Sequence, residues 1–164
     1  MTRQIVNQLI ILEETAIALY DPFLNPSTEV DLFFSMYKAN LANVRKIEEK
    51  LAPLGLSLGR LCLLRALQRI GRPALPSELG DDLAVTRANI SGLLRGLEKA
   101  GMVRREIDAS DRRRVLVHLT PRGIETLQQA WPLYEEAIAG QFHALSPDEK
   151  RAMLSLLRKL PAGG

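Results

Sequence analysis

The chain has 164 residues, of which 46% are hydrophobic and 25% charged, and its formal net charge is +3. This composition indicates a soluble globular protein with one sizeable core. It excludes a disordered or membrane-spanning chain, since no apolar run approaches the ~18 residues of a spanning helix. The one cysteine, Cys62, excludes an intrachain disulfide and fits a reducing compartment. The first residues lack the features of a signal peptide, so we expect a cytoplasmic protein without a membrane partner.

Two amphipathic helices are expected at the start of the chain. Residues 2–20 repeat apolar side chains at steps of three and four, which is the spacing of one helix face. The second helix begins at Ser27 or Thr28, which can cap it, and ends at Pro53 and Gly55. It would span about six turns with an apolar stripe along its length, so it needs a partner surface.

Three further helices are expected next. Ser57 can cap the first and Gly71 can end it, and apolar residues surround most of this helix, which predicts a buried position. The segments PSELGDDLAV and TRANISGLLRGLEKAG are typical of two short helices, with Ala84 and Val85 in the turn between them. Such a pair is the pattern of a helix-turn-helix.

The second helix of this pair has two different faces. Its expected core side consists of Thr86, Ile90, Leu93, Leu94 and Leu97. Its expected outward side consists of Ala88, Ser91, Gly92, Arg95 and Lys99, with Asn89 at the edge and Arg87 in the first turn, where its side chain can swing outward. Small residues let a helix approach the DNA major groove closely, Arg and Asn can pair with base edges, and Ser can bond phosphate. This face predicts a DNA recognition helix, although an ordinary amphipathic helix pair gives a similar pattern.

A β-hairpin is expected after this helix, because MVRREI and RRVLVHL are strand-like on either side of an acidic turn at residues 108–111. The alternate positions expected to face inward are Val115, Val117 and Leu119. Three consecutive arginines, Arg112, Arg113 and Arg114, place positive charge near the tip, where Asp111 can pair with a guanidinium and stiffen it. Beside a recognition helix, such a loop predicts a wing that follows the phosphate backbone or enters the minor groove.

Two helices complete the chain. Thr120 can cap the first of them, with Pro121 at its first helical position, and it should run to Phe142 or its neighbours. Ser146 and Glu149 form a capping box for the last helix. The expected fold is therefore mainly α with a small β-hairpin wing, that is, a winged helix-turn-helix flanked by long helices.

Basic charge is concentrated around the helix and the hairpin. Residues 87–122 contain nine basic and four acidic side chains, a net charge of +5, which leaves −2 for the rest of the chain. A local basic surface on a near-neutral body is typical of a protein that binds a polyanion. A solvated charged face would give the same count, so charge supports DNA binding without establishing it alone.

The stretches RANISGLLRGLEKAGMVRR and DASDRRRVLVHLTPRG resemble the winged helix-turn-helix of the MarR family of bacterial transcriptional regulators. The second stretch is the more specific, with an acid-rich turn, Asp-x-Arg, a short apolar strand, Leu-Thr and a nearby Gly. The resemblance extends over roughly residues 28–160 and includes the long flanking helices. The helix expected at residues 2–20 departs from the family pattern, since it is longer than in the simplest members.

The resemblance implies a division of the chain. Residues 1–55 and 121–164 would build a homodimer interface, and residues 56–120 would form the DNA-binding domain. The residues expected to bind DNA are Arg87, Ala88, Asn89, Ser91, Gly92, Arg95, Asp111, Arg112, Arg113 and Arg114, with Arg113 at the wing tip and Asp111 as its positioning partner. The dimer would bind double-stranded DNA at a pseudo-palindromic site with half-sites about 10 bp apart. The implied function is sequence-specific regulation, most often repression in this family.

Family members often respond to small aromatic or phenolic anions that bind between the dimerisation helices and the winged domain. The side chains that could line such a pocket here are Phe33, Phe34, Tyr37 and Trp131, although aromatic residues on long amphipathic helices mostly form core or dimer contacts. Some relatives instead sense oxidants through a cysteine near the N-terminal helices. Because Cys62 lies in a different segment, redox control through Cys62 is kept only as an alternative.

An enzyme, a metal site and a cofactor are not expected. His118 and His143 have no neighbouring ligand spacing, and the sequence has no glycine-rich phosphate loop, CxxC pair or Ser/His/Asp arrangement. A winged helix that binds protein or RNA is the second alternative. The arginine-rich wing and the small residues on the outward helix face favour duplex DNA.

Overall fold

The computed structural model describes residues 27–83 and 85–160. The helix expected at residues 2–20 and the turn residue Ala84 therefore lie outside the described residues. The chain divides into two compact units at the boundary between Asn40 and Leu41, which falls within helix α2 (Thr28–Leu51). Ser27 precedes this helix, and its Oγ lies 3.5 Å from the amide nitrogen of Val30, so the expected cap is confirmed.

Helix α3 is the central helix of the second unit. The 3₁₀ turn η1 (Ala52–Leu54) separates it from α2, and α3 itself covers Leu58–Ile70. Ser57 caps α3, and Gly71, with a φ of 69°, ends it in the left-handed conformation that glycine adopts without strain. The carboxylate of Glu48 accepts a hydrogen bond from the Leu58 amide at 2.8 Å and so fixes the entry to α3.

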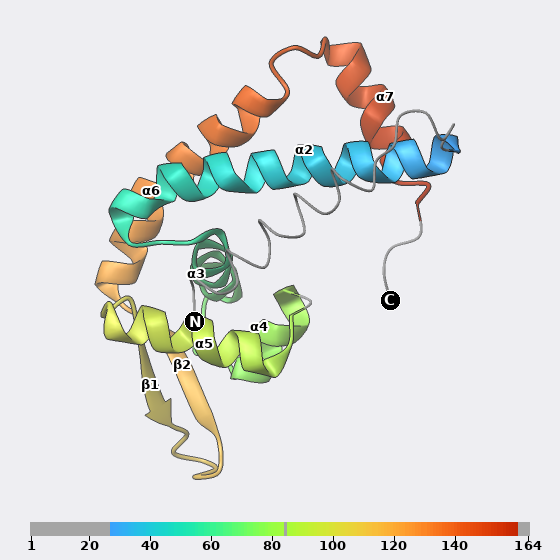
Figure 1. Ribbon diagram of the computed structural model, residues 1–164. Helices are drawn as coiled ribbons and strands as arrows, with labels where there is room; N and C mark the ends of the chain where they lie inside the picture. The colour runs from blue at the N-terminus through green and yellow to red at the C-terminus, as the bar shows by residue number, and fades with distance from the viewer. Residues whose placement is uncertain (1–26, 84, 161–164) are drawn as a thin grey trace. The chain divides into compact units, whose positions relative to one another are not determined.

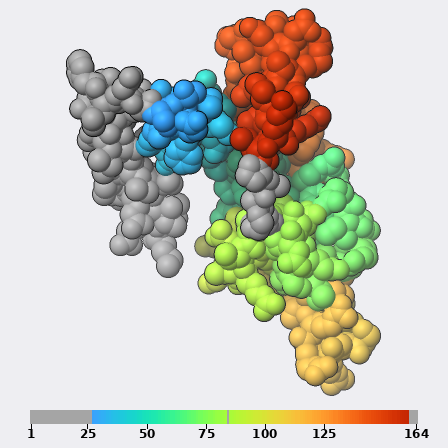
Figure 2. Space-filling model, turned by 90° about the vertical axis from the view of Figure 1, so that its right-hand side faces the viewer, coloured from blue at the N-terminus to red at the C-terminus, as the bar shows by residue number. Residues whose placement is uncertain are grey.

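The helix pair and the hairpin follow as the sequence predicts (Figure 1). The elements are α4 (Pro76–Leu83), α5 (Arg87–Lys99), β1 (Val103–Ile107) and β2 (Val115–Leu119). The strands are antiparallel, with Val103 opposite Leu119 and Ile107 opposite Val115. At the middle of β2, the hairpin gains a third backbone partner, because Ala74 and Val117 exchange hydrogen bonds of 3.0 and 2.8 Å. The rest of the hairpin projects beyond the helices, as the narrow gold extension in Figure 2 shows.

Helices α6 (Pro121–Gln141) and α7 (Pro147–Leu157) close the chain. Thr120 caps α6 with Pro121 in its first turn, as expected. The side chain of Ser146 and the side chain of Glu149 complete the expected capping box of α7. No residue of α7 is buried, whereas α6 contributes Leu127 and Ala130 to the core.

The core joins the end of α2 with α3, α4, α5, the hairpin and α6. Its largest fully buried side chains are Leu51, Leu61, Leu63, Leu64, Leu79, Ile90, Leu94, Leu97, Val117 and Leu127. Two side chains expected to face inward do not. Thr86 is exposed because it caps α5 with its hydroxyl, and Val115 is 38% exposed because the outer part of the hairpin extends beyond the helices that cover Val117.

Candidate nucleic-acid interface

The outward face of α5 is exposed along its length. Every residue expected on this face is exposed, namely Arg87, Ala88, Asn89, Ser91, Gly92, Arg95 and Lys99. The opposite face buries Ile90, Leu94 and Leu97, each at most 1% exposed. A helix anchored on one side presents its other side rigidly, which insertion into a DNA groove requires.

The first two turns of α5 are suited to the close approach of an anionic surface. Thr86 Oγ1 lies 3.4 Å from the Asn89 amide nitrogen and satisfies one of the amides that a helix N-terminus leaves without an intrahelical acceptor. The positive end of the helix dipole favours a phosphate oxygen near the others. At Gly92, an added Cβ would meet no described atom within 4 Å. Internal packing therefore does not require glycine there.

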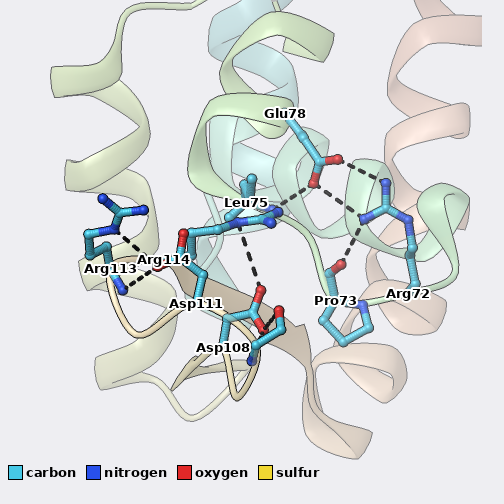
Figure 3. Close-up of polar contacts among 9 residues, drawn as sticks. Arg72, Pro73, Leu75, Glu78, Asp108, Asp111, Arg113 and Arg114 are labelled. Atoms are coloured by element: carbon cyan, nitrogen blue, oxygen red, sulfur yellow. Dashed lines mark hydrogen bonds and ion pairs between the residues drawn. The ribbon is translucent and has the colours of Figure 1, made fainter.

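At the wing tip, the structure brings Asp111 and Arg113 together. Asp111 Oδ1 accepts hydrogen bonds from the Arg113 amide at 3.0 Å and from its Nε at 3.2 Å (Figure 3). These two hydrogen bonds lower the pKa of Asp111, so the carboxylate is ionised at neutral pH. The Arg113 side chain nevertheless remains 92% exposed, and its guanidinium keeps most of its surface for an external acceptor.

Asp108 organises the start of the same turn. Its Oδ1 accepts hydrogen bonds from the Ser110 hydroxyl at 2.6 Å and from the Ser110 amide at 2.9 Å. Its Oδ2 lies 3.8 Å from Nε of Arg114. The Ser110 hydrogen bonds, with a smaller contribution from Arg114, lower the pKa of Asp108. The two acidic residues of the turn thus hold different partners.

An open cleft with a volume of about 440 Å³ lies between the start of α4, the exposed side of α5 and the wing. Four arginines line it: Arg87 from α5, Arg105 from β1, and Arg113 and Arg114 from the wing. Ser91 contributes a hydroxyl from the middle of α5. The opening is thus lined with guanidinium groups that can donate hydrogen bonds to a polyanion, while Glu98, Asp111 and Asp108 partly offset the charges of Arg105, Arg113 and Arg114.

Arg105 is a lining residue that was not assigned from the sequence. Its Nε lies 3.3 Å from Oε2 of Glu98, which connects β1 to α5. Strand alternation could have identified it, because Val103, Arg105 and Ile107 share one face of the hairpin and the buried Val103 marks the face that meets the helices.

Glu78 in the first turn of α4 connects several segments. Its two carboxylate oxygens accept hydrogen bonds from Arg72 at 2.8 and 3.3 Å, and one of them also accepts a hydrogen bond from the Leu75 amide at 2.7 Å. The Arg72 hydrogen bond is the largest of the effects that lower the pKa of Glu78 to about 2, and the charge of Arg114 adds a smaller effect. No sequence pattern points to this arrangement, because Glu78 and Arg114 belong to elements far apart along the chain.

The four aromatic residues predicted to line a ligand pocket fall in both units, so each group is described by itself. In the first unit, the Phe33 ring packs edge-on against Phe34 at a centroid distance of 5.5 Å and stacks on Tyr37 at 6.3 Å. Phe33 is 64% exposed. In the second unit, Trp131 lies under Arg65, whose Cζ is 4.7 Å from the ring centroid. Their role in binding a ligand stays a prediction.

Cys62 is half-buried on α3, and burial raises the pKa of its thiol. A raised pKa disfavours the thiolate, which is the reactive form. Within residues 27–83 and 85–160, no three His, Cys, Asp or Glu side chains are grouped so that they could hold a metal ion. In the same part of the chain, every helix is too short or too polar to cross a membrane.

Comparison with known proteins places this arrangement among transcriptional regulators. A family model described as MarR family matches residues 54–114. The uncharacterized HTH-type transcriptional regulator YkoM of Bacillus subtilis (strain 168) is 36% identical over 87 residues, which cover 53% of this chain and 56% of YkoM. The HTH-type transcriptional repressor YetL of the same organism is 31% identical over 132 residues, which cover 80% of this chain and 79% of YetL.

Two solved structures extend the likeness to three dimensions. A mutant of MarR from E. coli, crystallised with operator DNA, matches with a TM-score of 0.72 and 28% identity over 80% of this chain and 95% of that one. BpsR of Bordetella bronchiseptica, whose DNA binding is regulated by 6-hydroxynicotinic acid, matches with a TM-score of 0.70 and 26% identity over 79% of this chain and 97% of that one. These matches confirm the fold predicted from the sequence.

Proposed function

Because the chain belongs to the MarR family of transcriptional regulators, we propose that it is a repressor that binds its operator as a homodimer. The observation that carries this proposal is that the exposed side of α5 and Arg113 of the wing border the same arginine-lined cleft. The likeness to YetL, which is a repressor, supports the sign of regulation. The likeness to MarR in its operator complex supports duplex DNA as the partner.

In the proposed complex, α5 enters the major groove. Arg87, Asn89 and Arg95 reach base edges or phosphates, while the small residues Ala88, Ser91 and Gly92 permit the close approach. The wing lies along the backbone beside this groove, with Arg112 towards phosphate. Arg113, held by Asp111, reaches into the minor groove. Phosphate contacts supply most of the affinity and make it fall steeply with salt.

The proposed dimer buries apolar residues that one copy of the chain leaves exposed. On and beside α7 these are Met153, Leu154, Leu156, Leu157 and Leu160, with exposed fractions from 38% to 62%. Several large apolar side chains exposed on one helix are typical of an interface. We assign dimerisation to residues 1–55 and 121–164 and DNA binding to residues 56–120. A two-fold dimer then presents two α5 helices to half-sites about 10 bp apart.

A small aromatic or phenolic ligand is the proposed signal for release. The regulation of BpsR by 6-hydroxynicotinic acid supports this class of molecule. Phe33, Phe34, Tyr37 and Trp131 are the side chains we propose for its recognition. The ligand must bind more tightly to the dimer geometry that does not fit DNA, since only a difference in affinity between the two states shifts the balance. Control by oxidation of Cys62 is disfavoured by the raised pKa of its thiol.

Fluorescence anisotropy tests the proposed function directly. Binding to the DNA upstream of the protein's own gene is compared with binding to a scrambled duplex at about 150 mM salt and across a salt series. At least about 100-fold tighter binding to the upstream DNA is expected of a specific regulator. Equal binding to both duplexes contradicts operator recognition in that DNA, and absence of binding to either contradicts the DNA-binding function.

A further inference from the structure

The three consecutive arginines of the wing have different surroundings. Arg113 is bound to Asp111 and is 92% exposed. Arg112 is exposed, and no carboxylate within residues 27–83 and 85–160 pairs with it. Arg114 is only 47% exposed, and its side chain points back towards the helices rather than outward (Figure 3). One run of like charges is thus divided between outward-facing and inward-facing positions.

Two carboxylates lie on either side of the Arg114 side chain. Asp108, in the wing turn, is 14% exposed and places Oδ2 3.8 Å from Nε of Arg114. Glu78, on α4, is the second, and the charge of Arg114 contributes to lowering its pKa. Figure 3 shows the Arg114 side chain running from the wing towards Glu78, with Asp108 beneath it. The positive charge of Arg114 therefore faces two carboxylates of the protein itself.

The hairpin needs a support of this kind because its outer part is bare. The exchange of hydrogen bonds between Ala74 and Val117 holds the hairpin only as far out as the middle of β2. Further out, Ile107 is 62% exposed and Val115 is 38% exposed, so little apolar packing holds the strands in place. On the β1 side, the ion pair of Arg105 with Glu98 ties the hairpin to α5. On the β2 side, Arg114 pairs with Asp108 of the wing turn, and its side chain extends towards Glu78 at the start of α4 (Figure 3).

We propose that Arg114 is a positioning residue, which lies between Asp108 and Glu78, holds the wing against α4 and so sets where Arg113 meets DNA. The expected effect of Arg114 on operator affinity rests on the proposed function, whereas its expected effect on the position of the wing does not. Its consequence is that Arg114 contributes to operator affinity without neutralising a phosphate, whereas its neighbour Arg112 neutralises one.

Hydrogen exchange of the unliganded protein tests the support of the wing without DNA. Arg114→Gln is compared with the wild-type protein and with Arg112→Gln, which removes the same charge from the adjacent position. Amides of residues 103–119 should exchange faster in Arg114→Gln, while those of α3 keep their protection and show that the fold is intact. Asp108→Asn should have the same effect. Wing exchange as slow as in the wild-type protein in both variants overturns the proposal.

A salt series with the upstream and scrambled duplexes tests how Arg114 acts on binding. Arg114→Gln should weaken binding about threefold to tenfold and leave the slope of log K against log salt close to the wild-type value. Arg112→Gln should reduce the magnitude of that slope by about 1, as expected for a lost phosphate contact. A reduction of the same size in Arg114→Gln would mean that Arg114 touches phosphate, and the positioning role would be wrong.

Neutralising Glu78 should change DNA affinity in opposite directions, depending on whether Glu78 acts only through net charge or helps to hold Arg114. If only net charge matters, Glu78→Gln makes the surface more positive and tightens DNA binding. If Glu78 helps to hold Arg114, Glu78→Gln weakens binding, and Arg114→Gln adds little on top of it. Asp81→Asn is the matched control, since it removes one charge from the exposed side of the same helix. Tighter binding in Glu78→Gln, or full additivity with Arg114→Gln, overturns the proposal.

Hydrogen exchange of the unliganded protein and the DNA-binding titrations together separate this inference from the proposed function. Failure of the wild-type protein to bind either duplex contradicts DNA binding, and the exchange experiment still decides whether Arg114 holds the wing. Normal operator binding together with unchanged wing exchange contradicts only the role of Arg114.

Discussion

A single oxygen of Asp111 accepts hydrogen bonds from both the main-chain amide and the side-chain Nε of Arg113, two residues further along the wing. The side chain is therefore partly ordered before any partner arrives. Because ordering a long side chain on binding costs free energy, this contact raises the affinity that Arg113 can contribute. It also restricts the directions from which an acceptor can approach the guanidinium.

Replacing Arg113 should have the largest effect of any change in the wing. Arg113→Ala is expected to weaken operator binding by about 1–3 kcal/mol, as loss of a good groove contact does. Asp111→Asn should cost less, because the arginine remains but is no longer held. Anisotropy titrations measure both variants. Wild-type affinity in Arg113→Ala would remove the wing from the mechanism.

Gly92 separates the needs of folding from those of binding. Gly92→Ala should raise the free energy of unfolding by up to about 1 kcal/mol, because the position is helical and a Cβ there meets open space. Gly92→Leu should fold normally but bind the operator at least about tenfold more weakly, since the larger side chain holds α5 away from the groove. Thermal unfolding and anisotropy give the two readouts. Full affinity in Gly92→Leu would mean that α5 does not approach DNA closely at this position.

Gly123 is required by packing inside the chain. A Cβ at this position would overlap the carbonyl oxygen of Met102 and lie 2.8 Å from Cδ1 of Leu119. Since backbone cannot yield as a flexible side chain does, Gly123→Ala should lower the free energy of unfolding by about 1–3 kcal/mol. Chemical denaturation compares the free energies of unfolding of Gly123→Ala and Gly92→Ala. Equal changes in the two variants would contradict the distinction between the two glycines.

The pKa of Glu78 predicts a specific acid dependence of stability. Contacts in the folded state lower this pKa from 4.5 to about 2, so the ionised carboxylate stabilises the fold fully above pH 4.5. That contribution is lost as the pH falls from about 4.5 towards 2. Urea unfolding between pH 7 and pH 3 should therefore show a steeper loss in the wild-type protein than in Glu78→Gln. Parallel pH profiles would contradict the assignment.

The exposed leucines of α7 predict a loss of self-association when one becomes charged. Leu156 is 62% exposed, and Leu156→Glu should convert the proposed dimer to a monomer, because burying an unpaired carboxylate is costly. Ser155→Glu adds the same charge at the adjacent position and should disturb the dimer less. Light scattering after size exclusion measures the mass of each variant. An unchanged dimer in Leu156→Glu would place the interface elsewhere.

Local sequence signals predicted most of the elements and their ends. Ser57, Thr120 and the pair of Ser146 with Glu149 act within one helical turn, so their capping roles can be identified without a structure. The two errors have local causes as well. Thr86 has the spacing of a core residue but is used as a cap, and Val115 has the alternation of a buried residue but lies beyond the helices.

Contacts between distant segments could not be predicted in the same way. Asp111 and Arg113 are two residues apart, and an Asp-x-Arg turn suggests their pairing. Arg114 and Glu78 come together only because Ala74 joins the hairpin at Val117 and brings the start of α4 beside the wing. The sequence alone does not indicate which of the three consecutive arginines points towards the helices, so their different surroundings can be identified only from the structure.

In the proposed function, the carboxylates of the wing would also affect how quickly an operator is found. Between Asp108 and Arg114 the chain carries three arginines but only one net positive charge, because Asp108 and Asp111 offset two of them. Attraction to arbitrary DNA scales with the number of phosphates neutralised, and a genome offers about 10⁶–10⁹ such competing sites. A wing with lower net charge leaves wrong sites sooner, so each protein molecule surveys more of the chromosome in a given time. Asp108 and Asp111 would thus shorten the time that the protein stays bound at each DNA site and shorten its search for the operator.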